Sequence, residues 1–279
     1  MNKLITHCVL TGLIMSGINT EALAEKSKDQ LLTGESPELV GEAIAIELDE
    51  RDIGFVNQIS KMEMVLSNAY GQKNTRIMEA RILERPARDV GDKSMLVFFN
   101  PSAINGTALL SFAEILEPDQ QWLFLPALKR VKRISSKNKS GPFVGSEFAY
   151  EDITGNEIGK YSWRFEGLEA CPVTKELECF KLATIPKYEH SGYTKRIVWV
   201  DVEEFRADQI DFYDRKSSLI KTQTFHGYKE YLNNFWRADL WKMVNHQTGK
   251  STELFFKDYR FKTNLKEKDF SKASLKRIR

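Results

Sequence analysis

The side chains that could do chemistry in this sequence begin with a stretch of cations and a stretch of acids that follows it. The cations are Lys129, Arg130, Lys132 and Arg133, and the acids are Glu147, Glu151 and Asp152. Such side chains hold one another in ion pairs, or they bind a charged group of a ligand or partner. Two interpretations stay open. Arg130, Lys132 and Arg133 contact a headgroup or a partner protein, or they pair with the three acids.

Motifs of the common catalytic and metal sites are missing from the sequence. His190, His226 and His246 do not stand at the spacing of a zinc-binding helix. There is no Gly-x-Ser-x-Gly turn and no glycine-rich phosphate-binding loop. Acids gather between Asp201 and Asp214, but their spacing matches no calcium loop. We therefore expect a protein that is not an enzyme and that needs no metal or cofactor.

Two cysteines stand close together between strand-like segments. Cys171 and Cys179 are separated by a short polar stretch, and no histidine or further cysteine is near them in sequence. In an oxidising compartment this spacing favours a disulfide that closes the end of a hairpin. We expect that bond here.

The N-terminus has the pattern of an export signal. Lys3 precedes an apolar run from Leu4 to Ile18, and Ala22 and Ala24 supply the small residues that signal peptidase needs. The run is shorter than the roughly 20 residues that a membrane-spanning helix requires. We expect cleavage near Ala24 and an exported, soluble mature protein.

The charge balance excludes one class of partner. Removing residues 1–24 takes away Lys3 and Glu21, which leaves 40 basic (41 − 1) and 38 acidic (39 − 1) residues. Nucleic-acid-binding domains normally carry a clear basic excess, so no nucleic-acid partner is expected. Residues 25–35 are polar and are expected to form a flexible leader. Residues 36–279 should form a single domain with a basic C-terminal tail, either solvated or facing an acidic partner or anionic lipid.

The region after residue 35 predicts one helix followed by many strands. Ser36 is a suitable N-cap, Pro37 suits the first helical position, and apolar residues follow at helical spacing. From Lys61 onward apolar and polar residues alternate, as in half-buried strands. Strands are expected at 61–67, 75–84, 94–100, 107–113, 121–125, 130–135, 159–166, 179–185, 196–202, 209–213, 219–228, 235–245 and 251–259. About ten or more strands predict a mainly β (α+β) fold, with an antiparallel sheet curled into a barrel or half-open barrel.

Several strands are apolar on both faces. Trp122 and Phe124 share one face of their strand, while Leu123 and Leu125 share the other. Each such face must be covered, either by a helix or by a ligand. The side chains expected to line a ligand cavity are Met62, Met64, Met78, Phe98, Trp122, Phe124, Trp163, Phe165 and Trp199. The plain alternative is that they form ordinary core.

Two segments form a longer and more specific pattern. The first runs from Trp122-Leu-Phe-Leu-Pro126 to Lys129-Arg-Val-Lys-Arg-Ile134. The second is Phe143-Val-Gly-Ser-Glu-Phe-Ala-Tyr-Glu-Asp152, which departs from the pattern at Ala149, where a hydroxyl residue is more usual. Together they resemble the signature of the LolA-like outer membrane lipoprotein-sorting protein family. The resemblance extends from about Leu39 to the C-terminus, although only this central block is specific.

The resemblance implies a fold and a setting. Members of this family are similar in fold to LolA and LolB, with a large curved antiparallel sheet and helices that cover an apolar concave face. The implied compartment is the periplasm of a Gram-negative cell. The implied partners are a lipid or another hydrophobic small molecule and an inner-membrane exporter of the resistance-nodulation-division (RND/MMPL) type.

The leading hypothesis is therefore a monomeric, non-enzymatic periplasmic carrier of a lipid, lipoprotein or other hydrophobic molecule in cell-envelope transport. One alternative is a periplasmic adaptor that binds the exporter without carrying cargo. Another is a lipid hydrolase, for which the sequence offers no recognisable nucleophile.

Overall fold

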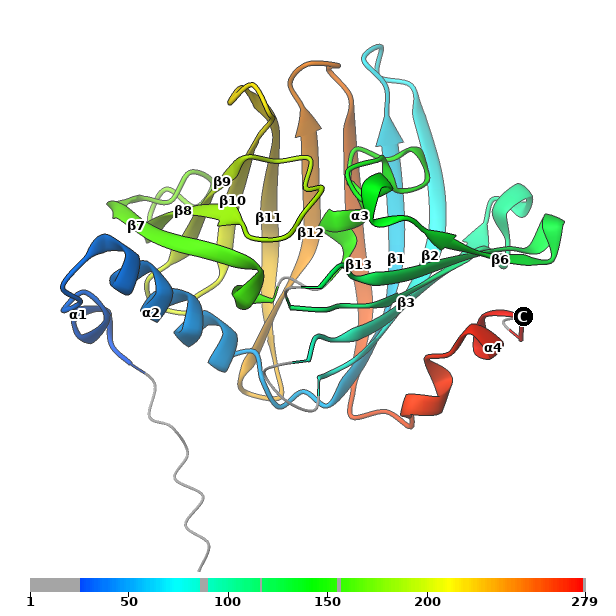
Figure 1. The fold of residues 1–279 in the computed structure, drawn as a ribbon, viewed down its shortest axis with the longest axis horizontal. Helices are drawn as coiled ribbons and strands as arrows, with labels where there is room; N and C mark the ends of the chain where they lie inside the picture. Colours follow the sequence, from blue (N-terminus) through cyan, green and yellow to red (C-terminus); the bar gives the residue numbers. More distant parts are fainter. Residues whose placement is uncertain (1–25, 86–89, 116, 155–156, 278–279) are drawn as a thin grey trace, which may run out of the picture.

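The computed structural model describes residues 26–85, 90–115, 117–154 and 157–277 (Figure 1). The predicted signal peptide, residues 1–24, lies outside the described residues. Within the described ranges, no helix combines the length and the apolar character needed to cross a bilayer.

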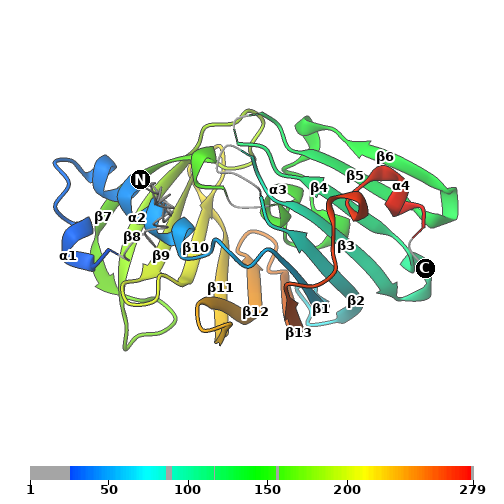
Figure 2. The same ribbon diagram turned by 90° about the horizontal axis from the view of Figure 1, so that it is seen from below.

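The chain forms one antiparallel sheet of thirteen strands in the order β6-β5-β4-β3-β2-β1-β13-β12-β11-β10-β9-β8-β7. The strands are β1 (Asn57–Ser67), β2 (Lys73–Leu83), β3 (Lys93–Asn100), β4 (Ala108–Phe112), β5 (Gln120–Leu125), β6 (Arg130–Ile134), β7 (Tyr161–Ala170), β8 (Glu178–Pro186), β9 (Lys195–Asp201), β10 (Ala207–Tyr213), β11 (Leu219–Tyr231), β12 (Phe235–Asn245) and β13 (Ser251–Phe261). Figures 1 and 2 show the sheet bent into an open half-barrel. The predicted fold class is confirmed.

Short helices lie on both sides of this sheet. The α-helices are α1 (Lys28–Leu31), α2 (Pro37–Glu50), α3 (Tyr150–Ile153) and α4 (Lys272–Leu275). Short 3₁₀ helices occur at η1 (Ser102–Ile104), η2 (Pro126–Leu128), η3 (Ser136–Asn138), η4 (Phe143–Gly145), η5 (Ile158–Lys160) and η6 (Glu267–Asp269). Because α2 and α3 lie on the concave side and α4 lies on the other, both faces of the sheet receive cover.

Helix α2 begins as the sequence predicts and packs on the concave side of β7. The hydroxyl of Ser36 accepts a hydrogen bond from the backbone N–H of Leu39 at 3.3 Å, which caps the helix. A Cβ at Gly41 would lie 2.8 Å from the backbone of Arg164 and Phe165. Only glycine allows the helix to approach the strand this closely.

Residues 26–35, within the predicted leader, contain the short helix α1. Ser27 caps α1 through a hydrogen bond from Gln30 N, and the side chain of Gln30 bonds back to Ser27 N. Leu31 is buried in the same cluster as the side chains under α2. Leu32 packs against the same cluster, so two apolar side chains hold this mostly polar stretch on the protein.

The two faces of the sheet carry separate hydrophobic clusters. On the concave face, Met62 of β1 pairs with Met78 of β2 and Phe256 of β13. On the convex face, Trp122 and Phe124 of β5 lie in a second cluster. The alternation of a strand assigns each residue to one face, and the register across strands keeps each set together.

The C-terminal segment covers the second cluster. Phe270 is 3% exposed and Leu275 is 0% exposed, and both belong to the cluster of Trp122 and Phe124. The ammonium group of Lys272 lies 4.9 Å from the Trp122 ring centroid. Figure 2 shows this segment beside the β3–β6 end of the sheet. The C-terminal segment therefore packs on the sheet and is not a solvated tail. It can do so because apolar side chains stand between its cations.

We predict that Phe270→Ala lowers the free energy of unfolding by about 3–5 kcal/mol, because it removes a large buried ring from this cluster. Lys276→Ala is the matched control, since Lys276 is exposed in the same segment and its loss should change stability by less than about 0.5 kcal/mol. Urea denaturation of both variants measures the difference. Equal stability of the two variants would mean that the segment is not docked.

Candidate functional site

A cavity of about 400 Å³ lies on the concave face. Strands β1–β4 and β9–β13 form its floor and walls, while α3 and the residues just after α2 close it from above. Small-molecule sites usually have volumes of roughly 300–1,000 Å³, so this cavity is large enough for a ligand. A larger hollow of about 770 Å³ beside β5 and β6 is more open and more polar, and its lining includes Glu114, Asp119 and Arg133.

One wall of the cavity is aromatic. It is built from Phe212 of β10, Phe225 of β11, Trp241 of β12 and Phe256 of β13. Phe225 and Trp241 are direct cross-strand partners with ring centroids 5.6 Å apart, and the centroids of Trp241 and Phe256 are 4.9 Å apart. Rings at these distances support one another and form a stiff apolar surface.

The part of the cavity formed by β1 to β4 carries small hydroxyl side chains. Ser60 lies on β1, Ser94 on β3 and Ser111 on β4, and Ser94 and Ser111 are direct cross-strand partners. Ala80 of β2 lies among them and also borders the cavity. We call Ser60, Ser94 and Ser111 the serine wall. Because these side chains are small, they leave open space in the cavity.

The segment 139–154, which contains α3, forms a roof over the concave face (Figure 1). Phe143 and Phe148 anchor this roof segment because both are fully buried, and Phe143 N donates to the carbonyl of Phe148 at 2.7 Å. The guanidinium of Arg76 donates to the carbonyl of Val144 at 2.5 Å. Asp152 Oδ2 accepts from Ala149 N at 2.7 Å and starts α3 without a hydroxyl at Ala149.

Glu151 ties the roof segment to the loop that precedes β9. Its carboxylate accepts hydrogen bonds from the hydroxyls of Tyr188 and Ser191, both at 2.9 Å, and from Gly192 N at 2.8 Å. Burial raises the pKa of Glu151, and the charge of Asp152 raises it further, while these hydrogen bonds act in the opposite direction. Three donors on one buried carboxylate indicate a structural anchor.

Asp152 makes a second anchor to the same half of the sheet. Its carboxylate accepts from the hydroxyl of Tyr193 at 2.9 Å and lies 3.8 Å from the ammonium of Lys221. Burial raises the pKa of Asp152, and the Lys221 charge lowers it in part. Burial also raises the pKa of Tyr193 well above its ordinary value, so its hydroxyl stays a donor.

The side chains predicted to line a cavity lie elsewhere. Those on the concave face are Met62, Met64, Met78, Phe98, Trp163 and Phe165. None of them borders the cavity among its described lining residues. Phe98 instead contacts Phe143 of the roof segment, with ring centroids 5.9 Å apart, and α2 covers the Phe165 region of β7. In the structure these six residues pack in the hydrophobic cluster of the concave face.

The remaining three predicted lining residues are on the opposite face. Trp122 and Phe124 lie under the C-terminal segment. Trp199 packs beside the disulfide, and its indole N–H donates to Glu169 at 2.6 Å. The prediction failed because β5 is apolar on both faces and the sequence does not say which face curves inward.

The structure does not bring the three cations to the three acids. Arg130, Lys132 and Arg133 lie on β6, which is an edge strand of the sheet. Glu151 and Asp152 bind the loop before β9, as described above, and Glu147 accepts from Asn245 Nδ2 at 2.7 Å. The acids belong to the roof segment, which lies over the concave face. In the described part of the chain, the three cations have no carboxylate partner.

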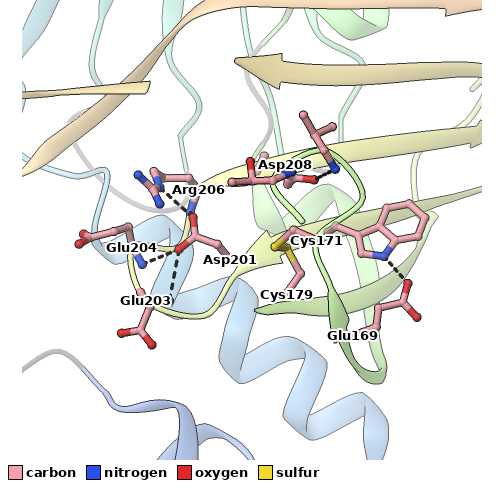
Figure 3. The surroundings of a disulfide bond; sticks show 12 residues. Glu169, Cys171, Cys179, Asp201, Glu203, Glu204, Arg206 and Asp208 are labelled. Carbon is pink, nitrogen blue, oxygen red and sulfur yellow. Dashed lines mark hydrogen bonds and ion pairs between the residues drawn. A yellow bond between two sulfur atoms is a disulfide. The ribbon is translucent and has the colours of Figure 1, made fainter. Parts of the chain in front are cut away.

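The predicted disulfide between Cys171 and Cys179 is present and closes the β7–β8 hairpin (Figure 3). Acids near it are satisfied by the chain itself. Asp208 accepts from two backbone N–H groups of the β7–β8 loop at 2.7 and 3.0 Å. Asp201 accepts from the backbone N–H and the side chain of Arg206 at 3.0 and 2.8 Å. The acids of this region therefore accept hydrogen bonds that hold the backbone of loops and turns.

Sequence reasoning missed both walls of the cavity. The signal for the aromatic wall was period-two alternation in the last four strands, such as Ile210 with Phe212 and Leu254 with Phe256. The serine wall has no signal that separates it from exposed serines. Its members are brought together only by the register of β1 to β4.

Asp92 borders the cavity, and burial raises the pKa of its carboxyl from the ordinary 3.8 to about 7. The folded protein therefore holds a proton that the unfolded chain releases, so this group's stabilising effect is complete below about pH 4 and is lost as the pH rises to about 7. Asp92→Asn keeps the oxygen that accepts from Arg85 N at 2.8 Å but cannot ionise. We predict that its stability gain over wild type grows by about 2–3 kcal/mol between pH 5 and pH 8, measured by urea denaturation. A pH-independent difference would contradict the raised pKa.

Sequence and structure comparisons place the chain among known proteins. A family model described as an uncharacterized protein matches residues 91–277. A crystal structure of an outer membrane lipoprotein-sorting protein domain from Vibrio parahaemolyticus is 48% identical to the chain. It aligns with a TM-score of 0.82 over 86% of this chain and 99% of that domain.

More distant relatives share the fold. A DUF1329 family protein from Desulfovibrio piger is 23% identical with a TM-score of 0.80, over 86% of this chain and 99% of that chain. A LolA superfamily protein from Nitrosomonas europaea is 18% identical with a TM-score of 0.67, over 84% and 98%. Uncharacterized protein PA3922 of Pseudomonas aeruginosa is 22% identical over 219 residues, which are 63% of this chain. The chain spans about half of that protein, 48% of its length.

The Vibrio domain carries the assignment, because its identity is high and the alignment covers nearly all of that domain. The two distant structures agree with it in fold. The chain belongs to the LolA-like outer membrane lipoprotein-sorting protein family.

Proposed function

We propose that this protein is a non-enzymatic carrier that binds the hydrocarbon part of a lipid or another hydrophobic molecule in the concave-face cavity. The observation that supports this function is the cavity of about 400 Å³ with one aromatic wall. A LolA-like fold is generally a carrier fold, which agrees with a binding role.

The energetics suit a carrier of hydrocarbon. Each CH₂ group removed from water is worth about 0.8 kcal/mol. A chain of several such groups against Phe225, Trp241 and Phe256 would be held without any charge–charge contact. Release would need the roof segment to move, and its anchors at Glu151 and Asp152 are the contacts that such motion breaks.

We place the carrier in the periplasm of a Gram-negative cell. The disulfide is suited to an oxidising compartment. The N-terminal sequence pattern, which lies outside the described residues, is that of an export signal. Both observations support export.

A partner in the inner membrane is a further part of the proposal. Arg130, Lys132 and Arg133 lie on an edge strand without carboxylate partners in the described chain, so they are available to a charged surface. An RND/MMPL-type exporter would supply or receive cargo. Cations on an edge strand also prevent unwanted strand pairing, and that role needs no partner. We propose a monomer as the working unit.

We predict that Ala80→Phe reduces binding of the uncharged fluorophore N-phenyl-1-naphthylamine at least tenfold, because the added ring occupies the cavity. Ala183→Phe is the matched control. It adds the same ring to β8, where Ala183 packs beside the disulfide on the opposite face. Fluorescence titration measures binding, and circular dichroism checks that both variants keep the fold.

Equal binding by Ala80→Phe and Ala183→Phe would place the fluorophore outside the cavity and contradict the carrier proposal. No binding by wild type would contradict it more directly and favour an adaptor.

A further inference from the structure

Ser60 occupies an unusual position in the cavity. It lies on β1 opposite a β-bulge of β13, where the pairing shifts from Ile59–Arg260 to Lys61–Lys257. Bulges redirect neighbouring side chains and occur often beside functional sites. Ser60 is 1% exposed and borders the cavity next to Ala80, its direct partner on β2.

The hydroxyl of Ser60 has no hydrogen-bond partner in the described part of the protein. The side-chain oxygen of Gln121 is in the same state, and Gln121 is also 1% exposed. Gln121 is the cross-strand partner of Ser111, and its amide nitrogen donates to the Ser111 hydroxyl at 3.4 Å. Buried polar atoms are nearly always satisfied, so an unpartnered hydroxyl at the wall of a cavity points to a missing polar group.

Charges near the serine wall argue against a charged group in that place. Asp52 and Asp92 both border the cavity at this end. Arg237 is bonded to Asp52 at 2.6 Å and to Gln58 at 2.9 Å. Asp52 is thus already paired, and Asp92, with its raised pKa, is protonated below about pH 7, so neither acid offers a positive charge that would hold a carboxylate or phosphate. An uncharged hydroxyl, ester or amide needs no such charge.

We propose that the cargo is an amphiphile whose uncharged hydrogen-bonding group lies against the serine wall and bonds to Ser60, while its hydrocarbon lies against the aromatic wall. This inference rests on the proposed carrier function and names the class of cargo. It assigns Ser60 as a specificity-determining residue. Both walls line one cavity, so one ligand can contact both.

The test uses two probes of equal length, 1-decanol and 1-chlorodecane, which compete with bound N-phenyl-1-naphthylamine. Only the alcohol can donate a hydrogen bond to, or accept a strong one from, a hydroxyl. The ratio of the two dissociation constants is compared between wild type and Ser60→Ala. Each probe loses the same hydration whether it binds wild type or Ser60→Ala. Dividing the ratio of dissociation constants for wild type by that for Ser60→Ala therefore isolates the contribution of the Ser60 contact. We expect the preference for 1-decanol to fall about tenfold in Ser60→Ala.

Two controls separate this contact from general damage. Ile210→Ala, at the apolar side of the cavity, should weaken both probes and leave their ratio unchanged. Ser60→Ala should melt at the same temperature as wild type or higher, because the variant loses a buried hydroxyl that had no partner. A clear fall in melting temperature would assign the hydroxyl a structural partner and overturn the inference.

The failures of the two proposals are distinguishable. If both probes displace the fluorophore and Ser60→Ala leaves their ratio unchanged, the carrier stands and the role of Ser60 is overturned. If neither probe nor the fluorophore binds wild type, the carrier proposal fails and this inference fails with it.

Discussion

The structure depends on one constraint, which is that strands apolar on both faces must be shielded from water on both sides. Thirteen strands in one sheet cannot cover themselves, and the chain provides the covers from its two ends and its middle. Helix α2 and the roof segment lie on the concave face, and the C-terminal segment lies on the convex face. The cavity is the part of the concave face that these covers do not fill. A carrier needs such a gap, since the ligand then completes the core.

The buried acids of the roof segment belong to this arrangement. Phe143 and Phe148 seat the roof segment in the core, and Glu151 and Asp152 fasten it to the loop before β9. Carboxylates that are buried and fully hydrogen-bonded fix a cover more precisely than apolar contacts, although they add little net stability. They also bridge the two halves of the sheet. The same anchors can therefore hold the cavity closed and set how the roof segment opens.

Much of the fold follows from sequence, but the side of the sheet on which a residue lies does not. Alternation and turn residues predict strands close to those observed, and Ser36 with Pro37 predicts the start of α2. In β5, however, Trp122 and Leu123 are equally apolar, so alternation cannot say which faces inward. That choice is made by register over many strands. The sequence does not predict the serine wall for the same reason. Ser60 and Ser111 line one cavity only because β2 and β3 set the register between their strands.

If the protein is a carrier, the cavity holds hydrocarbon in the cell. Native mass spectrometry of the full chain, purified from a periplasmic fraction without detergent and followed by lipid extraction, would detect that cargo. We expect a bound species with the mass of an amphiphile, retained in Ala183→Phe and absent from Ala80→Phe. A wild-type protein that is ligand-free as purified, and stays so after incubation with phosphatidylethanolamine–phosphatidylglycerol vesicles, would contradict it.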